Sequence, residues 1–154
     1  MGALFAMALA CSGYGDKVPE PVGSAPSFTP GTDGPPFISI DEIYAEFDRG
    51  AGFYFIDARP KVDYELERIL GAYSAPFYEV EDHFDRFPVG HWYIAYCACP
   101  HSESGIVAEY FWENGHENIG ILDEGFLEWV DRGYPTEGTG AGSGDDEEAG
   151  GEEG

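Results

Sequence analysis

Short apolar runs punctuate the middle of the chain. Residues 53–57, 92–96 and 119–122 are almost continuously apolar, and residues 71–76 form a weaker run. Runs of this length without a polar face are typical of strands that are buried on both sides in a parallel sheet. The pattern therefore predicts an α/β fold, with a parallel sheet covered by helices on both faces.

Amphipathic segments between these runs predict helices. Ser39 and Glu42 form the capping-box pattern of a helix start, and Gly50 ends that helix. Similar patterns predict helices over residues 63–69, 79–87, 102–114 and 125–132. Strands and helices thus alternate through residues 37–136, which we expect to form one folded domain.

The rest of the chain differs in composition from this domain. Residues 1–11 are apolar and mostly small. Residues 12–36 hold six of the 11 prolines among Gly, Ser and Thr, which predicts an extended, semi-rigid linker. Residues 137–154 are rich in glycine and acids and lack large apolar side chains, so we expect a disordered acidic tail.

The first 11 residues admit two interpretations. Ala8-Leu9-Ala10-Cys11 resembles the lipobox of a bacterial lipoprotein, in which Cys11 would be lipidated and would anchor the protein in the cell envelope, in the periplasm or on the outer surface. Residues 1–10 carry no Lys or Arg, however, whereas signal peptides begin with positive charge, and they are too few to span a bilayer. The alternative is a chance apolar start, or a true start further upstream, with a cytoplasmic location.

Charge and cysteine content narrow the functional classes. The chain has 30 Asp and Glu against 7 Lys and Arg, which gives a net charge of −23. This balance argues against binding to nucleic acids, whose phosphates need clustered Lys and Arg, and against attraction to anionic membranes. Cys11, Cys97 and Cys99 are too few for a disulfide framework or a four-ligand zinc site.

Cys97 is the side chain with the clearest chemical potential. It directly follows the apolar run at 92–96 and precedes the helix predicted from Ser102. Ligands of parallel sheets bind beyond the carboxyl ends of the strands, where Cys97 would lie. Loop amides and the dipole of the following helix would favour a thiolate and would stabilise an anion bound to it. The alternative is an inert, buried structural cysteine.

Three stretches, one of which contains Cys97, occur along the chain in an order that is specific as a set. The first is YFIDAR at residues 54–59, followed by Asp63, Tyr64 and ILGA at residues 69–72. The second is Tyr96-Cys97 itself, and the third is LDEGFLEW at residues 122–129 with Gly-Tyr-Pro at 133–135. Over about two thirds of the chain, this order resembles a single rhodanese (sulfurtransferase) domain.

The resemblance implies a five-stranded parallel sheet flanked by helices on both faces, and no cofactor. It implies that Cys97 takes a sulfane sulfur as a persulfide from a donor such as thiosulfate. The sulfur would pass to a thiophilic acceptor such as cyanide, a dithiol or a protein thiol. The substrate-binding loop would comprise Ala98, Cys99, Pro100, His101, Ser102, Glu103 and Ser104.

The chain departs from the family pattern in its charges. Arg68 stands where members often have His, Glu124 replaces a glycine of the closing motif, and the loop lacks Lys and Arg. We therefore expect poor turnover of thiosulfate, which is a dianion, and another donor or a protein persulfide as the natural one. No Arg follows Cys97 before Arg132, which argues against the oxyanion-gripping loop of related phosphatases.

Other residues keep more than one interpretation. Asp57 and Arg59 could orient the loop or a substrate, or form a structural ion pair. Cys99 could resolve an oxidised Cys97 as a disulfide, although such a ring is strained. Two functions rival sulfur transfer: a non-catalytic rhodanese-fold module that binds a protein partner, and a thiophilic metal carrier that uses Cys97, Cys99 and His101. The remaining histidines are interpreted as solvated: His83, His91 and His116.

Overall fold

The computed structural model describes residues 16–98 and 101–141. Cys11, Cys99, Pro100 and the acidic residues from 145 onward lie outside the described residues. The main sheet consists of β1 (Phe37–Ile38), β2 (Phe53–Asp57), β4 (Tyr73–Ser74), β5 (Trp92–Tyr96) and β6 (Ile119–Leu122). The helices are α1 (Ile40–Asp48), α2 (Lys61–Leu66), α3 (Val80–Phe84), α4 (Ser102–Glu113) and α5 (Gly125–Asp131).

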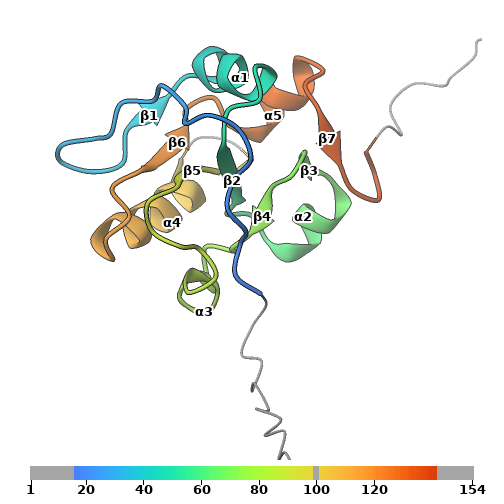
Figure 1. Ribbon diagram of the computed structural model, residues 1–154. Coiled ribbons are helices and arrows are strands. Elements are labelled where there is room, and N and C mark those ends of the chain that lie inside the picture. Colours follow the sequence, from blue (N-terminus) through green and yellow to red (C-terminus); the bar gives the residue numbers. More distant parts are fainter. Residues whose placement is uncertain (1–15, 99–100, 142–154) are drawn as a thin grey trace, which may run out of the picture.

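The five strands are all parallel, in the order β1-β6-β5-β2-β4, which confirms the predicted sheet. Helices cover both faces of the sheet, with α3 and α4 on one face and α1 and α5 on the other (Figure 1). Val80 of α3 and Phe111 of α4 belong to one hydrophobic cluster, whereas Ile43 of α1 and Trp129 of α5 belong to the other. The central strand β5 is buried along its whole length because both clusters pack against it.

The start of α1 confirms the predicted cap. The Oγ atom of Ser39 accepts a hydrogen bond from the amide of Glu42 at 3.3 Å. The carboxylate of Glu124, which replaces a family glycine, accepts a second bond from the amide of Ile40 at 2.8 Å. A carboxylate at a helix N-terminus also interacts favourably with the helix dipole. Glu124 therefore ties the loop after β6 to α1.

Three short strands were not predicted. β1 pairs with β6, while β3 (Arg68–Ile69) and β7 (Thr136–Glu137) form a separate antiparallel ribbon. Strands of two residues are too short to show a hydrophobic period, so the apolar pattern could not predict these three. The predicted helix over residues 63–69 is α2, which begins two residues earlier and gives way to β3. The ribbon also places Glu137, the first residue of the expected tail, in paired structure.

The described part of the proline-rich segment, residues 16–36, packs on the domain. It contains neither helix nor strand before β1, yet Val18 is 3% exposed and Phe28 is 5% exposed. The ring of Phe28 contacts those of Phe53 and Trp92 edge-on, with centroids 5.2 and 5.3 Å apart. Val18, Val22 and Phe28 interrupt the prolines. The segment docks because the side chains of Val18 and Phe28 bury apolar surface, whereas Val22 stays exposed. We call residues 16–28 the strap.

Polar contacts hold the strap at its middle. The guanidinium of Arg49 donates to the Oγ atom of Ser24 at 2.8 Å and to the carbonyl of Ala25 at 3.0 Å, and it pairs with Glu46. The amide of Gly52 donates to the carbonyl of Ser24 at 2.7 Å.

In the described part of the chain, no helix has the length and apolar character that crossing a bilayer requires.

The interpretation of His116 as a solvated residue is wrong. His116 follows α4, is 2% exposed and lies among the rings of Phe84, Tyr93 and Phe111. Within the described part of the chain, its Nδ1 atom is buried without a hydrogen-bond partner. Burial lowers the pKa of this imidazole, with a smaller contribution from the nearby His91. His116 is therefore a neutral core residue.

Candidate functional site

Cys97 lies where the sequence places it, directly after the central strand β5. The amide of Ala58 donates to the carbonyl of Tyr96 at 2.9 Å and extends the ladder to the strand end. Cys97 is 2% exposed and belongs to the cluster on the α3/α4 face. Its Sγ atom lies 3.2 Å from the Oγ atom of Ser104, which is itself 1% exposed. The sulfur thus has a hydroxyl partner at this buried position.

Helix α5 fixes the direction of the peptide groups next to Cys97. The amide of Phe126 donates to the carbonyl of Cys97 at 2.9 Å, and that of Leu127 donates to the carbonyl of Ala98 at 3.3 Å. In a trans peptide unit the C=O and N–H bonds point in opposite directions. The amide N–H of Ala98 therefore points away from α5, toward the face of the sheet that carries the sulfur.

This contact needs a glycine at the start of α5. Gly125 has a φ angle of 81°, and a Cβ atom there would lie 2.9 Å from the carbonyl oxygen of Ala98. A side chain would push the loop away from α5 and release its carbonyls. The glycine that the chain retains in the closing motif is therefore the one that supports the cysteine loop.

His101 lies at the other end of the loop, where its ring contacts Asp123 and Phe37. Its φ angle is 57°, which is unfavourable for a residue other than glycine. The Nε2 atom lies 2.9 Å from Oδ1 of Asp123 and 2.5 Å from the carbonyl oxygen of the same residue. The ring also stacks at a tilt on Phe37, with centroids 4.5 Å apart. His101 therefore anchors the loop to the ends of β1 and β6.

Helix α4 starts directly after His101 and brings Ser102, Glu103 and Ser104 into its first turn. Amides of a first helical turn have no acceptor within their own helix, and the helix dipole makes this end positive. The carboxylate of Glu103 lies in the same turn, and its negative charge opposes the positive potential of the helix end. Burial raises the pKa of Glu103, and the negative charges of Asp63 and Asp57 add to the rise. Acidic side chains therefore surround the start of α4 beside the loop.

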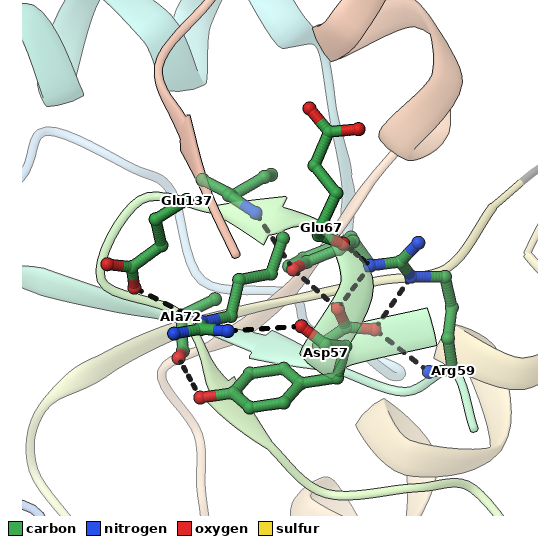
Figure 2. Close-up of polar contacts among 9 residues, drawn as sticks. Asp57, Arg59, Glu67, Ala72 and Glu137 are labelled. Carbon is green, nitrogen blue, oxygen red and sulfur yellow. Dashed lines mark hydrogen bonds and ion pairs between the residues drawn. The ribbon is translucent and has the colours of Figure 1, made fainter. Parts of the chain in front are cut away.

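Asp57 and Arg59 form a buried ion pair (Figure 2). The guanidinium donates through its Nε and one terminal nitrogen to the two carboxylate oxygens of Asp57, at 3.0 and 2.7 Å. The hydroxyl of Tyr96 donates to the same carboxylate at 2.7 Å, and Arg59 also donates to the carbonyl of Glu67 at 2.6 Å. The pair joins β2, β5 and the α2–β3 turn, which supports the structural interpretation of Asp57.

The guanidinium of Arg59 also lies over the ring of Phe126, 4.0 Å from its centroid. Arg59 is therefore held by a carboxylate and by an aromatic face, and it is only 7% exposed. The neighbouring carboxylate raises the pKa of Arg59 despite its burial. Because its charge is matched by Asp57, Arg59 adds little positive potential at the site. Tyr96 is a member of this network that sequence reasoning missed, since a tyrosine in a buried strand carries no specific signal.

The structure brings Cys97, Ala98 and Ser104 together, and it places His101 against Asp123. Cys99 and Pro100 lie outside the described residues, and so do their contacts. Among residues 16–98 and 101–141, no group of three or more His, Cys, Asp or Glu is arranged to hold a metal ion. Because the Nε2 atom of His101 is engaged by Asp123, the geometry lends no support to a carrier site that includes His101.

A sequence profile described as a Rhodanese-like domain matches residues 39–132. This protein belongs to the rhodanese-like domain family. The match covers β2, β5, β6 and all five described helices, and it includes Cys97. A comparison with curated proteins finds no match to this chain.

Solved structures of other proteins share the fold. The BH2092 protein from Bacillus halodurans is 23% identical with a TM-score of 0.63, covering 68% of this chain and 78% of its own. The rhodanese-like domain of the Alr3790 protein from Anabaena sp. is 21% identical with a TM-score of 0.63, covering 77% of this chain and 87% of its own. Both comparisons show the five-stranded rhodanese architecture for this chain.

A thiosulfate sulfurtransferase from Pseudomonas aeruginosa is also similar. It is 25% identical with a TM-score of 0.56, and the alignment covers 68% of this chain. The same alignment covers only 20% of the Pseudomonas protein, so this chain corresponds to a fifth of that enzyme.

Proposed function

We propose that this rhodanese-like protein is a sulfurtransferase that carries a sulfane sulfur on Cys97. The observation that carries the proposal is the position of this sulfur at the carboxyl end of the central strand, 3.2 Å from the hydroxyl of Ser104. The similarity to a thiosulfate sulfurtransferase supports the same reaction type.

The reaction needs a sulfur that can alternate between thiolate and persulfide. The Cys97 thiolate attacks the outer sulfur of a donor such as thiosulfate, and the donor's S–S bond breaks as sulfite leaves with the electron pair. A nucleophilic acceptor, such as cyanide or a thiolate, then attacks the outer persulfide sulfur, and Cys97 leaves as a thiolate. Neither step needs a cofactor or an external oxidant.

The residues around Cys97 can stabilise both anionic forms. The hydroxyl of Ser104 can donate to the sulfur, and the amide of Ala98 points toward the same face of the sheet. The left-handed conformation of His101 brings α4 into line with the loop, so that the positive end of the helix dipole faces it. A backbone conformation of this cost at a loop end is typical of functional sites.

The charges of the site favour a donor other than thiosulfate. Glu103 and Asp63 place negative charge beside the loop, and Arg59 is neutralised by Asp57. These carboxylates would repel a dianionic donor, whereas they would not repel a neutral or a cationic persulfide. We therefore propose that the protein accepts sulfur from a low-charge or protein-bound persulfide and turns over thiosulfate slowly.

The test is to load the protein with sulfur and locate the adduct. Wild type and Cys97→Ser, each with Cys11 and Cys99 replaced by Ser, are incubated with thiosulfate or with a neutral organic persulfide and analysed by mass spectrometry. We expect a gain of one sulfur on Cys97 that cyanide removes, with faster loading by the neutral donor. A failure of both donors to load Cys97 would contradict the proposal and favour the non-catalytic binding module.

The location of the protein follows from a separate proposal, which rests on the sequence near Cys11. We propose that Cys11 is lipidated and anchors the domain in the cell envelope. The mature protein should then begin at Cys11 and carry the mass of its acyl groups. An unmodified Cys11 in protein purified from its own membranes would support the cytoplasmic alternative.

A further inference from the structure

A second site is indicated by Arg86, which has no carboxylate partner among the described residues. Among the described residues, Arg49, Arg59, Arg68 and Arg132 each form an ion pair with a carboxylate. Arg86 forms none within the described part of the chain, and its Nε atom is buried there without a hydrogen-bond partner. In a protein with 30 Asp and Glu residues, an arginine without a carboxylate is unexpected.

Arg86 lines a cavity of about 320 Å³ between α2, β4 and α3. Lys61 and His83 line the same cavity. Three basic side chains thus gather there, although the whole chain has only seven Lys and Arg and four His. Tyr64 and Ser74 add hydroxyl groups to the wall. Because Lys61 follows β2 and Ser74 ends β4, the cavity lies at the carboxyl edge of the sheet.

Arg86 and Lys61 make only weak polar side-chain contacts within the described part of the chain. A terminal nitrogen of Arg86 lies 3.4 Å from Nδ1 of His83, which is a long hydrogen bond. The Nζ atom of Lys61 lies 3.7 Å from a carboxylate oxygen of Glu65, and both of these side chains are mostly exposed. An exposed pair at this distance contributes little, so Lys61 can turn toward the cavity at small cost.

One carboxylate also lines the cavity. Glu79 has an Oε2 atom 3.6 Å from Nε2 of His83, and its side chain is half exposed. The charges of Lys61 and Arg86 exceed that of Glu79 even with a neutral His83. The formal charges of the side chains that line the cavity therefore sum to a positive value, within a chain of net charge −23.

We propose that this cavity binds a small oxyanion, such as sulfate or the sulfate-like end of a larger molecule. Arg86 and Lys61 would hold the anion by charge-assisted hydrogen bonds, and the hydroxyl of Ser74 could add a third donor. The negative field of the rest of the surface makes such binding selective for this cavity, because other surface regions repel anions. The site is distinct from Cys97 and does not depend on sulfur transfer.

The test uses sulfate as the probe and the full chain as the protein. Sulfate binding is followed by calorimetry and by the midpoint of thermal unfolding, with chloride added to keep the ionic strength constant. We expect saturable binding that raises the midpoint. Lys61→Gln and Arg86→Gln should each weaken it about tenfold, which corresponds to one charge-assisted hydrogen bond. Arg132→Gln is the matched control, since it removes the same charge from an exposed ion pair elsewhere.

Two further variants make the outcome decisive. Arg86→Lys keeps the charge and should restore part of the affinity, which separates anion binding from a structural role of the side chain. Cys97→Ser should bind sulfate as wild type does, even if the proposed sulfur transfer is wrong. Absence of saturable binding, or equal weakening by Arg132→Gln and Lys61→Gln, would overturn the proposal. In the second case sulfate would act only through the overall charge of the protein.

Discussion

The hydroxyl of Ser104 lies 3.2 Å from the sulfur of Cys97, and both side chains are buried. The two residues come from different parts of the fold, since Cys97 directly follows β5 and Ser104 lies in the first turn of α4. When the sulfur is a thiolate, it can only accept a hydrogen bond, so the hydroxyl must donate. This contact is the most direct link between the fold and the proposed chemistry.

Removal of this hydroxyl should slow sulfur loading. We expect Ser104→Ala to lower the rate of persulfide formation on Cys97 by about 10- to 100-fold, the range for loss of one hydrogen bond to a charged atom. The rate is measured by mass spectrometry under single-turnover conditions. Alkylation of Cys97 by iodoacetamide, followed on its peptide, should slow in parallel. An unchanged loading rate in a variant that unfolds at the wild-type denaturant midpoint would exclude this role.

The buried pair of Asp57 and Arg59 should dominate the stability of the carboxyl edge. Asp57→Asn leaves a buried guanidinium without its counter-charge, and we expect a loss of about 3–5 kcal/mol in the free energy of unfolding. Urea denaturation measures this loss. The control is Asp41→Asn, which breaks the exposed pair with Arg132 and should change stability little. If Asp57→Asn lost as little stability as Asp41→Asn, Arg59 would have found another partner or water in that variant.

The strap should contribute to folding through Val18. Val18 is 3% exposed and Val22 is 92% exposed, so the same substitution has different consequences at two sites on one segment. We expect Val18→Ala to lower the free energy of unfolding by about 1–2 kcal/mol and Val22→Ala to leave it unchanged. The comparison of the two denaturant midpoints is the measurement. Equal midpoints would mean that the strap does not stay docked in solution.

His116 should make the protein sensitive to acid. Its pKa is lowered in the folded state, so the unfolded chain binds a proton more readily. The stability that the neutral imidazole provides is complete above its unfolded pKa of about 6.5, and it is lost as the pH falls below that value. We expect His116→Phe to lose less stability than wild type between about pH 7.5 and pH 5. Parallel unfolding midpoints over this range would contradict the assignment.

Apolar runs predicted the main strands because burial on both faces demands them. The central strand and the position of Cys97 after it could therefore be predicted before any coordinates. Asp123 could not be predicted as the partner of His101, because the two residues meet only when β6 lies beside β5. The burial of His116 was missed for a similar reason, since the aromatic rings around it come from α3, β5 and α4.

The strap shortens the reach of any membrane anchor at Cys11. If residues 12–36 were a free linker, they would let the domain move up to about 90 Å from the bilayer. Val18 is buried in the domain, so only the seven residues from Cys11 to Val18 remain to span that gap. A fully extended chain of that length reaches about 25 Å. A lipidated form would therefore work close to the lipid headgroups, where its sulfur acceptor would also have to be found.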